Sequence, residues 1–134
     1  ETDAGRLAEA VLEGVAFALA DGLDALRAAG TRIEQLTVVG GGARSDYWGR
    51  IIAAALDTPL CYLRGGEVGP ALGAARLARA AVEGVDAPGL FAAPALSHVI
   101  EPDRALRERL TEKQQLFRTA YRRISDTHQY ESAA

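Results

Sequence analysis

Large apolar residues recur at helical spacing over the first part of the chain. They follow one another at steps of three and four, at Leu7, Val11, Val15, Leu19, Leu23 and Leu26. Charged residues fall largely between them, and Gly30 stands where a glycine commonly ends a helix. The pattern predicts a helix from about residue 6 to residue 28.

A strand, a helix and a second strand are predicted next. Residues 33–39 become apolar in their second half, as expected for a strand that is covered on both faces. Ser45 is placed to cap a helix that ends before Thr58-Pro59, and residues 60–63 form a second short apolar run. Because one helix connects the two strands, we expect them to pair in parallel through a right-handed crossover.

Two more helices are predicted further along the chain. Pro70 suits the first position of a helix that runs to about Val82 and ends at Gly84. Its small residues would let another element pack closely against it: Ala71, Gly73, Ala74, Ala75 and Ala78. A last helix opens at residues 101–103, and its buried face is expected to hold Leu106, Leu110, Phe117, Tyr121 and Ile124.

The remaining segments set the expected limits of the domain. Residues 85–100 contain Pro88 and Pro94 and show no apolar period, which predicts a surface connection. We expect one domain over residues 1–126 and a frayed tail over residues 127–134. Two short strands are too few for an independent sheet, and the chain begins at Glu-Thr-Asp without any methionine. We therefore expect a piece of a longer protein with an incomplete sheet.

Composition excludes several classes of function. The net charge of −3 comes from scattered charges without a basic block, so we expect no nucleic acid partner. The single cysteine, Cys61, excludes an internal disulfide framework and fits a reducing, cytoplasmic compartment. No apolar stretch approaches the roughly 20 residues of a membrane span. The two histidines have no partner at metal-ligand spacing, so no metal site is predicted in the chain.

Three consecutive glycines between the first strand and its helix predict a nucleotide site. The run is Gly40-Gly-Gly-Ala-Arg-Ser-Asp-Tyr-Trp48, and its bare backbone would let a ligand approach closely. A P-loop is excluded because no lysine follows the glycines. An NADP site with Arg64 on the 2′-phosphate stays open, as does a simple tight turn without a ligand.

Asp46 favours a third interpretation, the adenosine site of actin-like, ribonuclease H-like kinases. A carboxylate in the first helical turn would repel a triphosphate placed on that helix N-terminus. It would tolerate or hydrogen-bond a neutral adenine or ribose. The charge therefore places the adenosine end of ATP near Ser45 and Asp46, with the phosphates running over the glycine backbone. A role for Asp46 as a helix-start residue alone explains the pattern nearly as well.

At these motifs the sequence resembles the FGGY carbohydrate kinases. The resemblance rests on the glycine run, on Gly65-Gly-Glu-Val-Gly-Pro-Ala-Leu-Gly-Ala-Ala-Arg-Leu-Ala78 and on Ala10-Val-Leu-Glu-Gly-Val-Ala-Phe-Ala-Leu19. It implies an α/β fold: the helix-rich C-terminal part of a ribonuclease H-like, actin-like ATPase domain with an incomplete parallel sheet. It also implies that residues 71–78 form a connecting helix at which two domains hinge.

The resemblance further implies an ATP- and Mg²⁺-dependent transfer of the γ-phosphoryl group to a sugar hydroxyl, with a pentose or a polyol as the sugar. The residues implied to bind the nucleotide are Gly40, Gly41, Gly42, Ala43, Ser45 and Asp46. The catalytic aspartate and the sugar pocket would lie in a region N-terminal to this chain, and no magnesium ligand is identifiable here. We therefore expect ATP or ADP as a partner, no transfer by the chain alone, and keep a homodimer open. A non-enzymatic interaction module is the remaining alternative.

Overall fold

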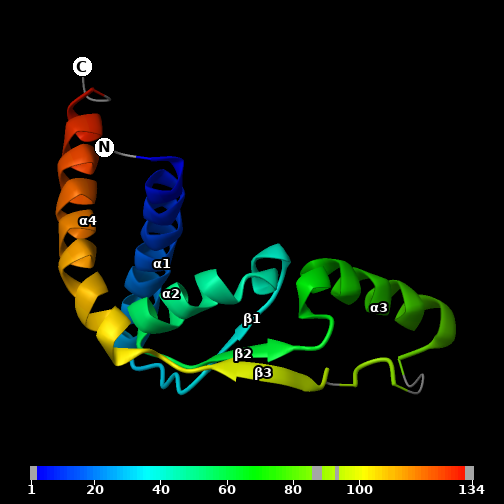
Figure 1. Ribbon diagram of the computed structural model, residues 1–134. Helices are drawn as coiled ribbons and strands as arrows, with labels where there is room; N and C mark the ends of the chain where they lie inside the picture. Colours follow the sequence, from blue (N-terminus) through cyan, green and yellow to red (C-terminus); the bar gives the residue numbers. More distant parts are fainter. Residues whose placement is uncertain (1–2, 86–88, 93, 132–134) are drawn as a thin grey trace.

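A computed structural model describes residues 3–85, 89–92 and 94–131, with side chains as far as residue 126. In this part of the chain it forms four α-helices, two 3₁₀ turns and three strands (Figure 1). The helices are α1 (Ala4–Ala28), α2 (Asp46–Leu56), α3 (Gly69–Glu83) and α4 (Arg104–Glu131). The strands are β1 (Leu36–Val38), β2 (Leu60–Leu63) and β3 (Leu96–Ile100), and the 3₁₀ turns are η1 (Gly41–Arg44) and η2 (Gly66–Val68).

Helix α1 confirms the predicted first helix but buries a different face. Asp3 caps it, because its Oδ1 accepts a hydrogen bond from the Arg6 backbone N–H at 2.8 Å. The large apolar residues of the predicted stripe are mostly exposed: Leu7, Val11, Val15, Leu19 and Leu26. The buried positions are Glu13, Ala16, Phe17, Ala20 and Leu23. The described residues thus leave an apolar face of α1 uncovered.

The strand–helix–strand unit is confirmed in its pairing and its cap. Strands β1 and β2 pair in parallel, with Leu36 opposite Leu60. The Ser45 side chain accepts a hydrogen bond from the Trp48 backbone N–H at 3.2 Å and so begins α2. The helix ends at Asp57, which adopts a left-handed conformation with φ 49°.

The predicted surface connection over residues 85–100 is wrong for its last five residues. Residues 96–100 form β3, which pairs antiparallel with β2 so that Ile100 lies opposite Leu60. The sheet has the order β1-β2-β3 and is therefore mixed rather than parallel. Four of the five β3 side chains are exposed, so backbone pairing rather than burial holds this strand, and no apolar alternation marks it.

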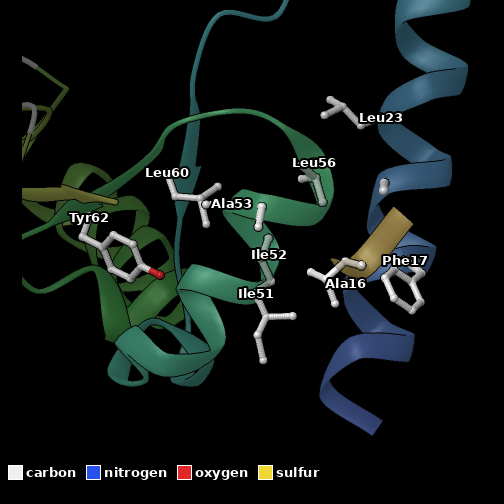
Figure 2. Close-up of a cluster of buried hydrophobic side chains, with 12 residues drawn as sticks. Ala16, Phe17, Leu23, Ile51, Ile52, Ala53, Leu56, Leu60 and Tyr62 are labelled. Carbon is white, nitrogen blue, oxygen red and sulfur yellow. The ribbon is translucent and has the colours of Figure 1, made fainter. Parts of the chain in front are cut away.

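The core lies on both sides of α2. Figure 2 shows Ile51, Ile52 and Leu56 of this helix between α1 and the sheet. From the sheet side come Leu60 and Tyr62, and from the α1 side Ala16, Phe17 and Leu23. Trp48 packs at the edge of this cluster and donates its Nε1–H to the Leu12 carbonyl at 3.2 Å. Trp48 therefore belongs to the core.

Helix α4 lies beside α1 and covers the core with only part of the expected face (Figure 1). Leu110 is buried, and Phe117 meets Phe17 at a ring-centroid distance of 5.7 Å. Tyr121 and Ile124 are 67% and 59% exposed, so the expectation that they are buried is wrong. These two lie beyond the last α4 residue in contact with the core. The helix continues to Glu131, and residues 132–134 of the expected tail lie outside the described residues.

Helix α3 begins and ends where the sequence predicts. Pro70 stands in its first turn, and Gly84, with φ 89°, ends it. It lies at the far end of the molecule from α1 and α4 (Figure 1). None of its residues is buried, so the close packing expected of its small residues does not occur within the described part of the chain.

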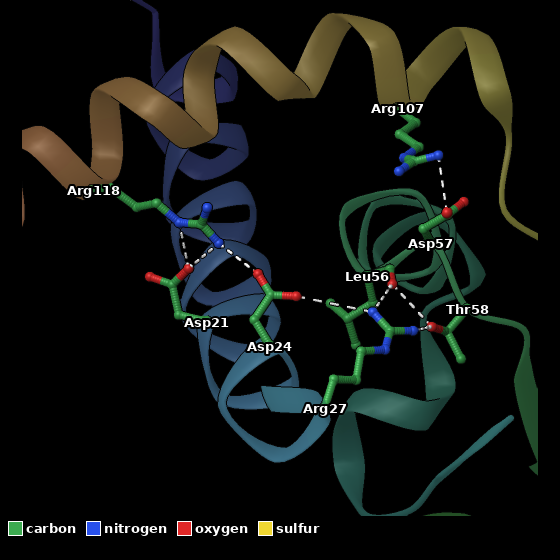
Figure 3. A network of polar contacts seen from close by, with 8 residues as sticks. All are labelled: Asp21, Asp24, Arg27, Leu56, Asp57, Thr58, Arg107 and Arg118. Carbon is green, nitrogen blue, oxygen red and sulfur yellow. Dashed lines mark hydrogen bonds and ion pairs between the residues drawn. The ribbon is translucent and has the colours of Figure 1, made fainter. Parts of the chain in front are cut away.

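A polar network joins α4 to α1 and to the end of α2 (Figure 3). Arg118 of α4 donates to Asp21 at 2.6 Å and to Asp24 at 2.8 Å, both on α1. Arg27 donates to the Thr58 hydroxyl at 2.7 Å, and Arg107 pairs with Asp57 at 2.9 Å. A further ion pair joins Lys113 of α4 to the buried Glu13 at 2.6 Å.

Removal of the Arg118 side-chain charge is expected to lower the free energy of unfolding by about 1–2 kcal/mol, since one guanidinium holds two carboxylates across two helices. Arg118→Met tests this in urea unfolding followed by circular dichroism. Arg104→Met is the matched control, because Arg104 is 91% exposed and its ion pair, with Glu108, lies within its own helix. We expect the control to change stability by less than about 0.5 kcal/mol. Equal effects of the two substitutions would contradict the assignment.

Candidate functional site

Two glycine loops meet at the carboxyl end of the parallel strand pair. The Gly40 N–H, after β1, donates to the Gly66 carbonyl, after β2, at 2.8 Å. A Cβ placed on Gly69 would lie 3.3 Å from the Cα and N atoms of Gly40. The carboxyl edge of parallel strands is where ligands bind in open α/β sheets. The two loops thus form a backbone surface at the edge where a nucleotide is expected.

Each of the three glycines in the predicted motif occupies its position for a different structural reason. Gly40 adopts φ 88° and ψ −174°, a conformation that residues with a side chain avoid. A Cβ on Gly42 would lie 2.6 Å from the Trp48 ring, so this glycine makes room for the core. Nothing lies within 4 Å of the Cβ position of Gly41, which is exposed. Gly41 therefore has no packing requirement and presents bare backbone to solvent.

The other predicted residues lie in the same turn and the helix start that follows it. The Ala43 N–H donates to the Gly40 carbonyl at 3.0 Å, and Ala43 is half-buried against the core. Ser45 is engaged as the cap of α2, whereas the Asp46 side chain is 62% exposed. The structure therefore brings all six predicted residues to one turn, and Asp46 remains accessible to a ligand.

Sequence reasoning missed a cluster that joins Asp46 to β3. Asp46 Oδ1 lies 3.3 Å from His98 Nε2, and the His98 ring stacks on Tyr62 at a centroid distance of 4.5 Å. Tyr62 is 4% exposed, and among the described residues its hydroxyl has no hydrogen-bond partner. A Cβ on Gly49 would overlap that hydroxyl and lie 2.8 Å from Ile100 Cδ1. The cluster could not be predicted from the sequence because strand β3 was not predicted, and the pairing of β3 with β2 brings His98 to Tyr62.

The environment of Tyr62 favours its neutral form. Burial raises the pKa of this phenol above its ordinary value of 10.0, and the negative charge of Asp46 raises that pKa further. Ionisation of Tyr62 therefore does not affect the free energy of unfolding below pH 10.0, and that free energy falls as the pH rises from 10.0 through the folded-state pKa.

Tyr62→Phe is expected to reduce the fall in the free energy of unfolding at alkaline pH. The parent chain should lose more free energy of unfolding than the variant between about pH 9 and about pH 11. Near neutral pH we expect the variant to be as stable as the parent or more stable, because an unpartnered buried hydroxyl is removed. Urea unfolding across this range measures both effects. Parallel curves for the two proteins would contradict the prediction.

Metal and membrane features are absent from the described part of the chain. No three His, Cys, Asp or Glu side chains come together there in a way that could hold a metal ion. None of the helices in residues 3–85 and 94–131 combines the length and the apolar character needed to cross a bilayer. Cys61 is a buried free thiol of β2.

The family model and the curated relatives that match this chain agree with one another. Residues 1–82 match the model of the FGGY family of carbohydrate kinases, C-terminal domain. A xylulose kinase of Escherichia coli (strain K12) is 56% identical over 75 residues, which are 56% of this chain and 16% of that protein. A xylulose kinase of Klebsiella pneumoniae is 49% identical over 98 residues, which are 72% of this chain and 20% of that protein.

Solved structures share the fold. A crystal structure of a xyloylose kinase from Brucella ovis superposes with a TM-score of 0.76 at 43% identity. That of a xylulose kinase from Rhodospirillum rubrum superposes with a TM-score of 0.73 at 29% identity. Each match covers 95% of this chain and 26% of the other. The chain therefore spans about a quarter or less of the length of the proteins it matches.

Proposed function

Because the chain belongs to the FGGY family of carbohydrate kinases, as part of the family's C-terminal domain, we propose that it is the ATP-binding portion of a xylulose kinase. The whole protein would transfer the γ-phosphoryl group of ATP to a hydroxyl of D-xylulose, giving D-xylulose 5-phosphate. The names of the relatives support xylulose as the sugar. Another pentose or polyol kinase of the family is the alternative. A cytoplasmic location, where ATP is supplied and thiols stay reduced, belongs to the proposal.

The observation that carries the proposal is the meeting of the two glycine loops at one sheet edge. The Gly40 to Gly66 hydrogen bond of 2.8 Å holds them together, and nothing lies within 4 Å of the Cβ positions of Gly40, Gly41 and Gly65. A nucleotide bound there would lie against Gly40 and Gly41, with Ser45 and Asp46 at one end. This arrangement agrees with the adenosine motif implied by the sequence.

The starts of two helices give the bound nucleotide a direction. Helix α2 begins with Asp46, whereas the first turn of α3 contains no acidic residue. Helix α3 begins at Gly69, beside Gly40, so its positive end faces the meeting point of the loops. We infer that the adenosine lies toward α2 and the phosphates toward α3. Neutral groups would then meet the Asp46 carboxylate, and the charged phosphates would meet a helix start whose own first turn carries no acidic side chain.

Magnesium is the accompanying ion expected for phosphoryl transfer, and the described residues do not supply a cluster of ligands for it. The general base and the sugar pocket are likewise proposed to lie outside these residues. The chain alone is therefore expected to bind nucleotide without turnover.

Calorimetric titration of the chain with ADP, ATP and NADPH tests the proposal. We expect saturable binding of ADP and ATP and none of NADPH. The protein encoded by the complete reading frame is then assayed with ATP and D-xylulose, with other pentoses and polyols as comparisons. NADPH binding without ADP binding would overturn the nucleotide assignment, and a better polyol substrate would overturn the choice of sugar.

A further inference from the structure

We propose that His98 is a positioning residue for the nucleotide site: it holds the Asp46 carboxylate so that its second oxygen, Oδ2, accepts a hydrogen bond from the adenosine end of the ligand. The inference rests on the proposed function, because it requires a nucleoside beside Asp46. It adds a residue from β3, which the sequence motif does not contain.

The polar neighbours of His98 favour one position for the proton on its ring. Nε2 lies 3.3 Å from Asp46 Oδ1, and Nδ1 lies 3.3 Å from the Ser97 hydroxyl oxygen. A carboxylate accepts only, so Nε2 is the donor toward Asp46. In this Nε2–H tautomer the Ser97 hydroxyl donates to Nδ1.

The His98 ring is itself held by the core. It stacks on Tyr62 with an interplanar angle of 13°, and the Tyr62 hydroxyl abuts Gly49, which lies one helical turn after Asp46. Contacts thus link the start of α2 to β2 and β3 through four residues: Asp46, Gly49, Tyr62 and His98. These contacts fix the distance between β3 and the start of α2. Asp46 Oδ1 takes part in them, and no bond within the described residues engages Oδ2.

Asp46 and His98 line a hollow of about 380 Å³ together with other charged groups. The effect of these groups on binding must be distinguished from the effect of His98. They are Arg50 on α2 and Glu101 and Asp103 beyond β3. Arg50 lies one turn from Asp46, but no hydrogen bond or ion pair within the described residues joins the two side chains. Arg50→Gln therefore changes the charge of the hollow without removing the contact that positions Asp46. It is the matched control.

The experiment is a double-mutant cycle on nucleotide affinity, with AMP and ADP as the probes. We expect His98→Leu and Asp46→Ala each to weaken binding of both nucleotides by about three- to tenfold. The double variant should bind no more weakly than Asp46→Ala, because His98 acts only through that carboxylate. His98→Gln retains an N–H donor and should recover part of the affinity, and Arg50→Gln should leave it within about twofold of the parent.

A spectroscopic measurement tests the positioning role independently of affinity. The ¹⁵N chemical shifts of the imidazole should show the proton of neutral His98 on Nε2 in the parent chain, and Ser97→Ala should weaken this preference. A proton on Nδ1 overturns the inference, as do additive losses in the double variant. Unequal losses for AMP and ADP would mean that His98 acts on the phosphates, which also overturns it. A parent chain that binds neither nucleotide overturns the proposed function together with this inference.

Discussion

Gly49→Ala is expected to lower the free energy of unfolding by about 3 kcal/mol or more. A methyl group at this position overlaps the Tyr62 hydroxyl and lies 2.8 Å from Ile100 Cδ1. The Tyr62 side chain cannot move easily, because its ring is buried and stacked on His98. Helix α2 would have to lift away from β2 and β3. Chemical denaturation followed by tryptophan fluorescence measures the loss, since Trp48 lies on the same helix.

Gly22→Ala is the matched control for Gly49→Ala. Gly22 also lies inside a helix, and nothing is within 4 Å of its Cβ position. The substitution removes a flexible residue and should stabilise the chain by about 0.5–1 kcal/mol. Tyr62→Phe combined with Gly49→Ala should recover part of the loss, because the overlapping hydroxyl is absent. A Gly49→Ala chain as stable as the Gly22→Ala chain would show that α2 does not press against Tyr62.

Gly40→Ala is expected to weaken ADP binding by at least about tenfold. Gly40 has φ 88°, so alanine there is strained and the loop must change its path. The hydrogen bond from Gly40 to Gly66 would then be lost, and the two glycine loops would separate. The added methyl group would also occupy the open space over the loop. Calorimetric titration with ADP at a temperature where both proteins are folded measures the effect.

Gly84→Ala separates backbone strain from a role in binding. Gly84 has φ 89° and ψ 157°, close to the conformation of Gly40, and nothing lies within 4 Å of either Cβ position. It ends α3, away from the two loops. Both substitutions should lower stability by a similar amount, of about 1–3 kcal/mol, and only Gly40→Ala should weaken ADP binding. An equal loss of affinity in the two variants would place the nucleotide elsewhere.

The sequence predicts those parts of the fold that have strong local signals. Ser45 at a helix start, Pro70 in a first turn and Gly84 after a last turn mark boundaries through backbone chemistry, which tertiary structure rarely overrides. The parallel pairing of β1 and β2 follows from the length of the connection between them. These elements also bring the six residues of the glycine motif together.

What the sequence does not predict depends on contacts between distant segments. Strand β3 exposes four of its five side chains, so its pairing with β2 leaves no hydrophobic pattern. The Asp46–His98 contact joins residues on different elements and follows only once β3 is placed. On α1, the pattern identifies a helix but not which face is buried, because small residues such as Ala16 and Ala20 let α2 approach closely. The apolar period alone favours Leu7 and Val11, which are exposed.

The ion pairs between α1 and α4 also bear on the order of folding events. Arg118 and Lys113 reach partners 97 and 100 residues away in the chain. Closing so long a loop is entropically unfavourable, whereas β1, α2 and β2 meet through short connections. We expect α4 to dock after the rate-limiting barrier. Loss of its ion pairs would then accelerate unfolding and leave the refolding rate nearly unchanged, so these contacts govern how long the folded chain persists rather than how fast it forms.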